Sequence, residues 1–181
     1  MVRTLNLDGD QQADLTVHGG VNKAVYAYPS EHYRYWRTEL PGIDLPWGMF
    51  GENFTTEGLF EETVYIGDRF RIGDAEVIVT EPRMPCYKLG IKFGRADMIK
   101  RFLASRGTGF YFAVAREGAV VAGDAIELIR QEQRKTSVGD ITRLYVFEKN
   151  DLKGLRQAIG IEWLPRSWKG YFQHQLEKQI A

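Results

Sequence analysis

The chain has 181 residues, of which 44% are hydrophobic and 13% aromatic, and its 24 basic residues balance 24 acidic ones. This composition is typical of a folded chain with its own core, and the zero net charge argues against a general binder of nucleic acid or membrane surfaces. No apolar run approaches the roughly 20 residues that a membrane-spanning helix needs. The first residues lack the apolar segment of a signal peptide, and the single cysteine excludes an internal disulfide. We therefore expect one principal domain in a reducing, cytoplasmic setting.

The first sixty residues predict short strands, one helix and one long loop. In chain order these are a strand at 2–7, a strand or helix start at 24–28, a helix from Pro29 to Leu40, a loop over 43–59 and a short strand within it at 53–56. The helix is indicated by Tyr33, Trp36 and Leu40, because their spacing places them on one face. A loop as long as 43–59 is often functional.

The middle of the chain carries the clearest pattern, a series of short strands separated by turns. The predicted elements are strands at 63–66, 69–72 and 75–80, a helix at 96–105 and a hairpin of strands at 110–115 and 120–129. The dipeptides Gly67-Asp68 and Gly73-Asp74 form the first turns, and strands so closely spaced favour a barrel or a sandwich. Pro82 and Pro85 remove backbone donors, so the strand ladder is expected to end before them.

The last forty-five residues predict three short helices after a polar linker at 131–136. The first helix starts at Ser137 with Asp140 as a capping residue, the second ends at Gly160, and the third starts at Pro165. So few residues make a weak core alone. We expect this unit to dock on the barrel or on a partner.

Cys86 lies in a proline-stiffened segment, Pro82-Arg83-Met84-Pro85-Cys86-Tyr87-Lys88-Leu89, between two cations. Nearby positive charge lowers the pKa of a thiol and favours the thiolate, which is the nucleophile and the soft metal ligand. The alternative is that Cys86 is a small buried hydrophobe, and spacing alone favours that alternative. A pairing of Cys86 with His18 for nucleophilic catalysis has no supporting local signature.

Two further segments combine glycines with polar or aromatic side chains. In His18-Gly19-Gly20-Val21-Asn22-Lys23, backbone amides can approach an anion while His18 and Lys23 add donors. A glycine turn with solvated His and Lys explains the same residues and is favoured on physical grounds alone. In residues 47–55, aromatic side chains and Asn53 could wall a ligand cleft, or the loop could simply cover the barrel mouth.

Other polar residues are given structural or solvent-exposed roles. Glu61 and Glu62 are predicted to be a solvated pair, and His32 and His174 to be surface residues. The stripe formed by Trp168, Phe172 and Leu176 is predicted to be core.

Taken together and in order, the three segments resemble the MOSC family, which is named for the C-terminal domain of molybdenum cofactor sulfurases. The motifs are H-G-G-x-x-K-A-V-Y at 18–26, G-M-F-G-E-N-F-T at 48–55 and P-R-x-P-C-x-K-L at 82–89, continued at 107–112 and 122–124. With the three-helix tail, the chain is most similar to the YiiM-like branch, and the resemblance covers essentially all of it.

The resemblance implies a mainly β fold with helices. A barrel-like MOSC domain is expected over residues 1–131, followed by a three-helix (3-alpha) domain over 137–181. Because the family usually carries additional strands before the segment at 5–10, the barrel is expected to lack those first strands.

The resemblance also implies a site. Cys86 is expected to bind molybdenum or carry the cofactor's sulfur chemistry, with His18 as a proton shuttle. The molybdenum cofactor, a molybdopterin, is expected to lie in a pocket formed by glycines, cations and polar side chains. These cofactor-binding residues are Gly19, Gly20, Lys23, Asn53, Arg83, Lys88 and Tyr111.

The implied activity is reduction of N-hydroxylated bases such as 6-hydroxylaminopurine, with electrons from a flavoprotein reductase. One alternative is a non-enzymatic carrier that hands on the cofactor or a sulfur atom from Cys86, and another is a regulatory domain in which Cys86 is inert. We expect a small-molecule substrate, no polymeric nucleic acid and no membrane, and leave open a homodimer. Pyridoxal phosphate is not expected, because it belongs to a separate desulfurase domain.

Overall fold

The centre of the computed structural model, which describes residues 1–9 and 19–180, is a curled half-barrel sheet of six strands. The strands are β1 Val25–Pro29, β2 Phe54–Thr56, β3 Arg69–Ile72, β4 Ala75–Pro82, β5 Phe110–Arg116 and β6 Ile126–Arg130. Their order across the sheet is β2-β1-β5-β4-β3-β6. β1 and β2 are parallel, and every other neighbouring pair is antiparallel. The predicted mainly β fold with helices is confirmed.

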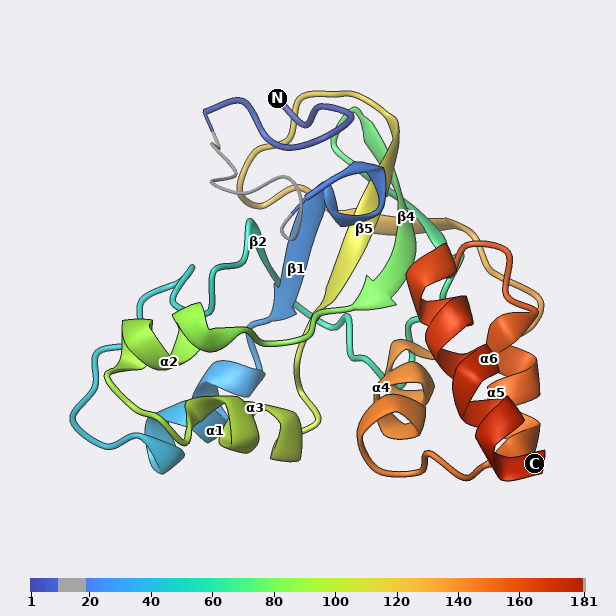
Figure 1. Cartoon of the computed structure of the whole chain (residues 1–181). Helices are drawn as coiled ribbons and strands as arrows, with labels where there is room; N and C mark the ends of the chain where they lie inside the picture. The colour runs from blue at the N-terminus through green and yellow to red at the C-terminus, as the bar shows by residue number, and fades with distance from the viewer. Residues whose placement is uncertain (10–18, 181) are drawn as a thin grey trace.

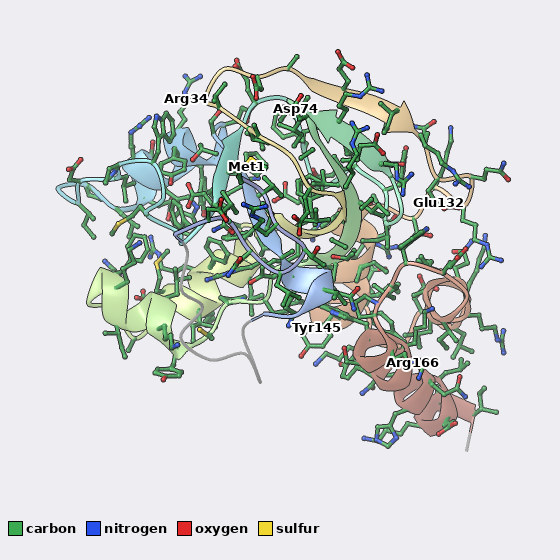
Figure 2. The ribbon with its side chains drawn as sticks, turned by 90° about the horizontal axis from the view of Figure 1, so that it is seen from above. Met1, Arg34, Asp74, Glu132, Tyr145 and Arg166 are labelled. Carbon is green, nitrogen blue, oxygen red and sulfur yellow. The ribbon has the colours of Figure 1, made fainter. Side chains whose placement is uncertain are left out.

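Helices lie to either side of the sheet in two groups (Figures 1 and 2). The first group is α1 His32–Glu39, α2 Tyr87–Phe93 and α3 Met98–Ala104, and the second is α4 Val138–Val146, α5 Leu152–Ile159 and α6 Arg166–Ile180. A 3-10 turn, η1 Val21–Lys23, leads into β1. The second group, hereafter the three-helix unit, is the predicted C-terminal unit, and it packs on the sheet.

The three-helix unit begins where the sequence predicts. The Ser137 hydroxyl accepts a hydrogen bond from the Asp140 backbone N–H at 3.0 Å, and the Asp140 carboxylate accepts one from the Ser137 N–H at 3.0 Å. This reciprocal box satisfies two backbone donors that an uncapped helix leaves unpaired. Trp168, Phe172 and Leu176 are buried, so the predicted core stripe of α6 is confirmed.

Two clusters of buried side chains hold the fold together. One lies between the sheet and the three-helix unit and includes Val77 and Phe110 from strands and Leu144 and Phe172 from helices. The other is largely aromatic and joins β1 to the first helix group, with Tyr28, Trp36, Phe50 and Phe102 fully buried. The predicted buried face of α1 belongs to this second cluster.

Two predicted strands are absent from the described residues. At 2–7 the chain makes a tight turn, in which Val2 forms isolated bridges with Leu7 and Gly118. At 63–66 Thr63 and Val64 bond back to the Phe60 carbonyl, and Tyr65 bridges Ser137. Both segments bury apolar residues, which explains their strand-like sequence, but their backbone groups bond within turns and to single distant residues such as Gly118 and Thr136 rather than along a strand ladder.

The predicted hairpin around Glu117-Gly118 is wrong. β5 pairs with β4 and β1, whereas β6 crosses to the far edge and pairs with β3. Gly118 and Val2 exchange backbone hydrogen bonds of 2.8 and 3.3 Å instead of closing a turn. A Cβ on Gly118 would lie 2.3 Å from the Asp74 carbonyl carbon, so glycine is required at this crossing.

β4 continues through Pro82, contrary to the prediction that the ladder ends before the prolines. β3 begins at Arg69, opposite Ile78, so the last residues of β4 extend beyond it and pair on one side only, with β5. A proline is tolerated on such a one-sided strand. The helix α2, which follows directly, was not predicted.

The predicted exposure of polar side chains is wrong for two residues and confirmed for two. Glu61 is fully buried and the His32 side chain is 21% exposed, and the two form an ion pair with each other. Glu62 and His174 are exposed as predicted.

Candidate functional site

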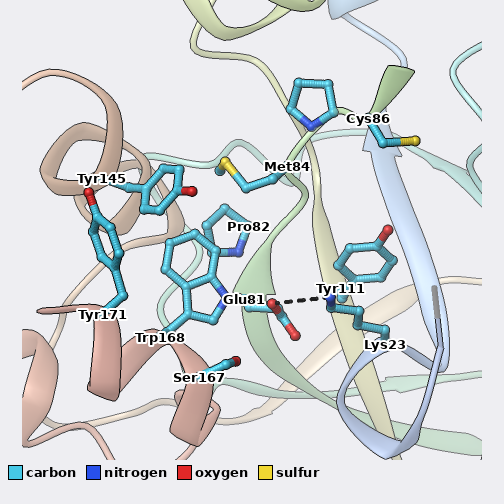
Figure 3. Close-up of a pocket in the computed structure, with 11 residues that line it drawn as sticks. Lys23, Glu81, Pro82, Met84, Cys86, Tyr111, Tyr145, Ser167, Trp168 and Tyr171 are labelled. Atoms are coloured by element: carbon cyan, nitrogen blue, oxygen red, sulfur yellow. Dashed lines mark hydrogen bonds and ion pairs between the residues drawn. The ribbon is translucent and has the colours of Figure 1, made fainter. Parts of the chain in front are cut away.

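Cys86 stands at the junction between β4 and α2. Its backbone is extended, its carbonyl accepts a hydrogen bond from the Leu89 N–H at 3.0 Å, and its side chain is half-buried. Figure 3 shows the Cys86 side chain on the same side of the site as Tyr111 of β5 and Lys23 of η1. The thiol therefore faces a site formed by three separate parts of the chain.

A cavity of about 270 Å³ opens on one side of Cys86, and we call it the cationic cavity. Seven of the nine predicted site residues line it: Gly19, Lys23, Asn53, Arg83, Cys86, Lys88 and Tyr111. Gly20 lies beside it with a φ of 90° but does not line it. His18 lies outside the described residues.

Arg83 is held by aromatic rings in this cavity. Its guanidinium carbon lies 5.3 Å from the centroids of both Tyr26 and Phe102, within the range of cation–π attraction. Its Nη1 atom is buried and has no hydrogen-bond partner within residues 1–9 and 19–180. A buried, unpaired donor is costly unless a ligand satisfies it, so this atom is suited to an anionic oxygen.

Lys23 is positioned by the contact of η1 with β4. The Thr80 hydroxyl lies 2.6 Å from the Asn22 carbonyl and 3.0 Å from the Tyr111 carbonyl, which ties the turn to both strands. The Lys23 ammonium lies 4.0 Å from a Glu81 carboxylate oxygen and 5.9 Å from the Tyr111 ring centroid. The lysine thus stands between a carboxylate and an aromatic face.

Asn53 has a structural role in the loop that walls the cavity. Its side-chain carbonyl accepts a hydrogen bond from the Tyr26 N–H at 2.8 Å, and its own N–H donates to the Tyr26 carbonyl at 2.9 Å. The adjacent Glu52 is buried and accepts hydrogen bonds from the Gly48 and Phe50 N–H groups at 2.9 and 3.1 Å. The loop is therefore organised by its own polar side chains, and the predicted ligand contact of Asn53 stays a prediction.

A second cavity, of about 390 Å³, opens on the other side of Cys86 between the sheet and the three-helix unit. We call it the aromatic cavity. Tyr145 of α4 and Trp168 and Tyr171 of α6 line it, opposite Cys86 and Tyr111 (Figure 3). Lys23, Met84, Cys86 and Tyr111 border both cavities.

Glu81 lies between the two sides of the aromatic cavity (Figure 3), and its side chain is 4% exposed. The Trp168 indole N–H donates a hydrogen bond to its Oε2 atom. Burial raises the pKa of Glu81, and the charge of Lys23 and the Trp168 hydrogen bond only partly oppose this shift. Sequence reasoning missed Glu81 as a site residue, although an acidic residue just after the apolar run at 77–79 was a visible signal.

Cys86 is the thiol donor of this part of the chain. In residues 1–9 and 19–180, no group of three or more His, Cys, Asp or Glu side chains is placed to hold a metal ion. The described residues therefore do not form a metal site of three or more such side chains around Cys86. The thiol suits a soft metal centre, and three cations in the same cavity suit an anionic group that carries it.

The chain belongs to the MOSC family, whose model, described as "MOSC domain", matches residues 14–127. The three-helix unit defines the branch within that family: residues 137–179 match the "YiiM-like, 3-alpha helix domain".

Two bacterial relatives are similar to this chain over most of their length. The chain is 40% identical to the uncharacterized protein YflK of Bacillus subtilis, covering 97% of this chain and 79% of that protein. It is 40% identical to protein YiiM of Escherichia coli, covering 93% and 75%. A protein of Gibberella moniliformis called a reductase is 37% identical over 141 residues, which are 75% of this chain and 25% of that protein.

Solved structures have the same fold. The crystal structure of YiiM from Geobacillus stearothermophilus superposes with a TM-score of 0.83 at 36% identity, covering 87% of this chain and 80% of that one. YiiM from Escherichia coli gives 0.86 at 30% identity, covering 98% and 85%. Within the described ranges, no helix combines the length and apolar character needed to cross a bilayer.

Proposed function

We propose that the protein is a molybdenum-cofactor-dependent reductase of N-hydroxylated bases such as 6-hydroxylaminopurine. The observation that carries the proposal is the convergence of Cys86 with Lys23, Arg83 and Lys88 on one cavity. Membership of the MOSC family, which is associated with the molybdenum cofactor, and the similarity to a protein called a reductase support it.

The residues of the cationic cavity fit the cofactor chemically. Cys86 would supply the thiolate ligand to the metal, and Lys23, Arg83 and Lys88 would bind the anionic phosphate. The buried, unpaired Nη1 atom of Arg83 is a donor that such an oxygen would satisfy. When bound, the cofactor supplies a redox-active metal that delivers two electrons to the N–O bond.

The reaction converts R–NH–OH, two electrons and two protons into R–NH2 and water. The N–O bond breaks, the oxygen leaves as water, and the electrons come from the reduced flavin of a partner reductase. The chain's own task is to hold the substrate and supply protons. His18 is the proton shuttle expected from the sequence, and Lys23 and Tyr111 are N–H and O–H groups that border both cavities.

The test compares wild type, Cys86→Ser and Ile91→Ser, all produced in cells that make the cofactor. Ile91 is 71% exposed on α2, so its variant controls for a serine placed close to the site. We expect near-stoichiometric molybdenum in wild type and Ile91→Ser, and a loss of at least about tenfold in Cys86→Ser, because a bond to the metal is removed.

Turnover is measured with the same proteins by following 6-hydroxylaminopurine conversion to adenine, with a chemical reductant in place of the flavoprotein. We expect turnover to follow molybdenum content across the three proteins. Molybdenum retained by Cys86→Ser would contradict the ligand assignment. Loaded wild type that does not turn over would contradict the reductase and favour a carrier of the cofactor.

A further inference from the structure

We propose that the aromatic cavity binds the flat, nitrogen-rich ring of the substrate, with the Glu81 carboxylate accepting a hydrogen bond from a ring or exocyclic N–H. This inference rests on the proposed function, because it names the substrate side of the same site. It goes further by assigning residues of the three-helix unit to substrate selection.

The two cavities share a border. Cys86, Met84, Lys23 and Tyr111 face both spaces, whereas Arg83 and Lys88 line only the cationic cavity and the three-helix unit lines only the aromatic one. An anionic group in the first space and a flat ring in the second would therefore both reach Cys86. The volume of about 390 Å³ lies in the range of small-molecule pockets and exceeds what a single purine or benzene ring requires.

One wall of the aromatic cavity is formed by aromatic rings of the three-helix unit. The Tyr145 ring centroid lies 5.0 Å from that of Trp168 and 4.7 Å from that of Tyr171, so three rings form one continuous panel. Trp168 is 7% exposed, which leaves only a small part of its surface open. Aromatic faces bind flat rings by offset or edge-on stacking.

The buried Glu81 carboxylate has few partners among the described residues. Among the described residues, only Trp168 donates a hydrogen bond to its side chain, and only Lys23 forms an ion pair with it, at 4.0 Å. Both contacts use Oε2 and none uses Oε1. A carboxylate this deeply buried is normally compensated by several donors. Oε1 is thus an available acceptor in the wall of a cavity.

These features together select for charge and shape. A ring with an amidine-like N–H group meets a carboxylate acceptor and an aromatic panel, whereas a phosphate or carboxylate in the same place meets a like charge. We therefore infer that free bases and aryl amidoximes enter this cavity, and that nucleotides and carboxylate-bearing analogues are disfavoured.

The alternative is that Glu81 only ties the three-helix unit to the sheet through Trp168. The two roles are separable with Glu81→Gln, because the glutamine carbonyl still accepts the indole N–H while the negative charge is lost. A purely structural role predicts equal changes for every ligand. A recognition role predicts a change only for ligands that need the charge.

The experiment measures binding to the full chain without cofactor, by titration calorimetry. The probes are benzamidine, a flat amidinium, and benzamide, its neutral isostere. We expect wild type to prefer benzamidine, and Glu81→Gln to lose affinity for benzamidine by at least about tenfold while its affinity for benzamide changes little, as expected for a hydrogen bond between charged groups. Glu76→Gln, on the same strand but outside both cavities, is the matched control and should keep the wild-type preference.

Several outcomes would overturn the inference. These are no binding of benzamidine to wild type, an equal loss for both probes in Glu81→Gln, or an unchanged preference in that variant. Because the probes bind without molybdenum, a failed molybdenum measurement leaves this test intact. Conversely, an active, loaded enzyme whose Glu81→Gln variant keeps its preference for amidoximes over carboxylate-bearing amidoximes overturns the subsite and leaves the proposed function standing.

Discussion

The imidazole Nε2 atom of His32 lies 2.9 and 3.1 Å from the two carboxylate oxygens of Glu61, a side chain that is fully buried. Glu61 also accepts a hydrogen bond from the Gly109 N–H at 2.6 Å, and its backbone carbonyl accepts one from the Gly139 N–H at 2.8 Å. One residue thereby joins α1, the start of β5 and the start of α4.

Glu61→Ala should lower the free energy of unfolding by about 3 kcal/mol, because it leaves a buried N–H and the imidazole without their acceptor. Urea denaturation measures the change. The neighbouring Glu62 is exposed, so Glu62→Ala should change stability by less than about 0.5 kcal/mol. Equal effects of the two substitutions would contradict the assigned role.

The same contact predicts a dependence of stability on pH. Burial alone lowers the pKa of His32, but the hydrogen bond and charge of Glu61, helped by Glu62 and Glu31, raise it by more, so the pKa lies above its ordinary value. A raised pKa in the folded state means that the contribution is complete below the unfolded value of about 6.5 and is lost as the pH rises through the folded value.

His32→Gln provides the comparison, since its amide can still donate to Glu61 but does not titrate. Unfolding free energies should be measured for both proteins from about pH 6 to pH 9, where the wild type should lose stability more steeply than the variant. Parallel curves would show that His32 does not titrate differently in the folded and unfolded states.

Arg83→Met should stabilise the cofactor-free chain by about 1 kcal/mol, because it replaces a buried, unpaired donor with a shorter, apolar chain. The same change should lower molybdenum content by at least about tenfold in cells that make the cofactor, since a charged hydrogen bond is lost. Arg37 also lies over aromatic rings but is exposed, so Arg37→Met should bring neither effect. A destabilised Arg83→Met chain would mean that the arginine is a structural residue.

Gly109→Ala should destabilise the fold by about 3 kcal/mol. Its φ of 68° is strained for alanine, and a Cβ there would lie 2.4 Å from the Ala27 carbonyl oxygen in the neighbouring strand. Gly170 in α6 has open space around its Cβ position, and Gly170→Ala should raise stability by about 0.5–1 kcal/mol through helix propensity. Thermal unfolding of the two variants checks the opposite signs.

The elements that the sequence predicted well are those whose pattern is local. α1, α3 and the three-helix unit carry apolar residues at helical spacing, and the short strands β3 and β4 are separated by the turn at Gly73-Asp74. α2 was missed because only Leu89 and Phe93 are buried on it, too few to produce a periodic signal. The partner of β6 was missed because strands adjacent in sequence usually form a hairpin. Here Gly118 pairs with Val2 instead of forming a hairpin turn, and β6 pairs with β3.

The residues of the candidate site also differ in whether a local sequence pattern could predict them. Arg83, Cys86 and Lys88 lie in one short motif, whereas the grouping of Lys23 with them was expected only from the resemblance to the MOSC family. Tyr145, Trp168 and Tyr171 reach the site only because the three-helix unit folds back on the sheet, and an apolar stripe predicts core rather than cavity wall. Glu61 was misjudged because its partner, His32, lies 29 positions away in the chain.

The larger buried cluster draws side chains from the sheet and from all three C-terminal helices. The MOSC segment and the 3-alpha segment therefore share one core and should unfold as one cooperative unit. Heat or denaturant should unfold the two segments together in a single transition. Cutting the chain between them should leave two fragments, each of which exposes the apolar side chains that pack against the other segment in the intact chain.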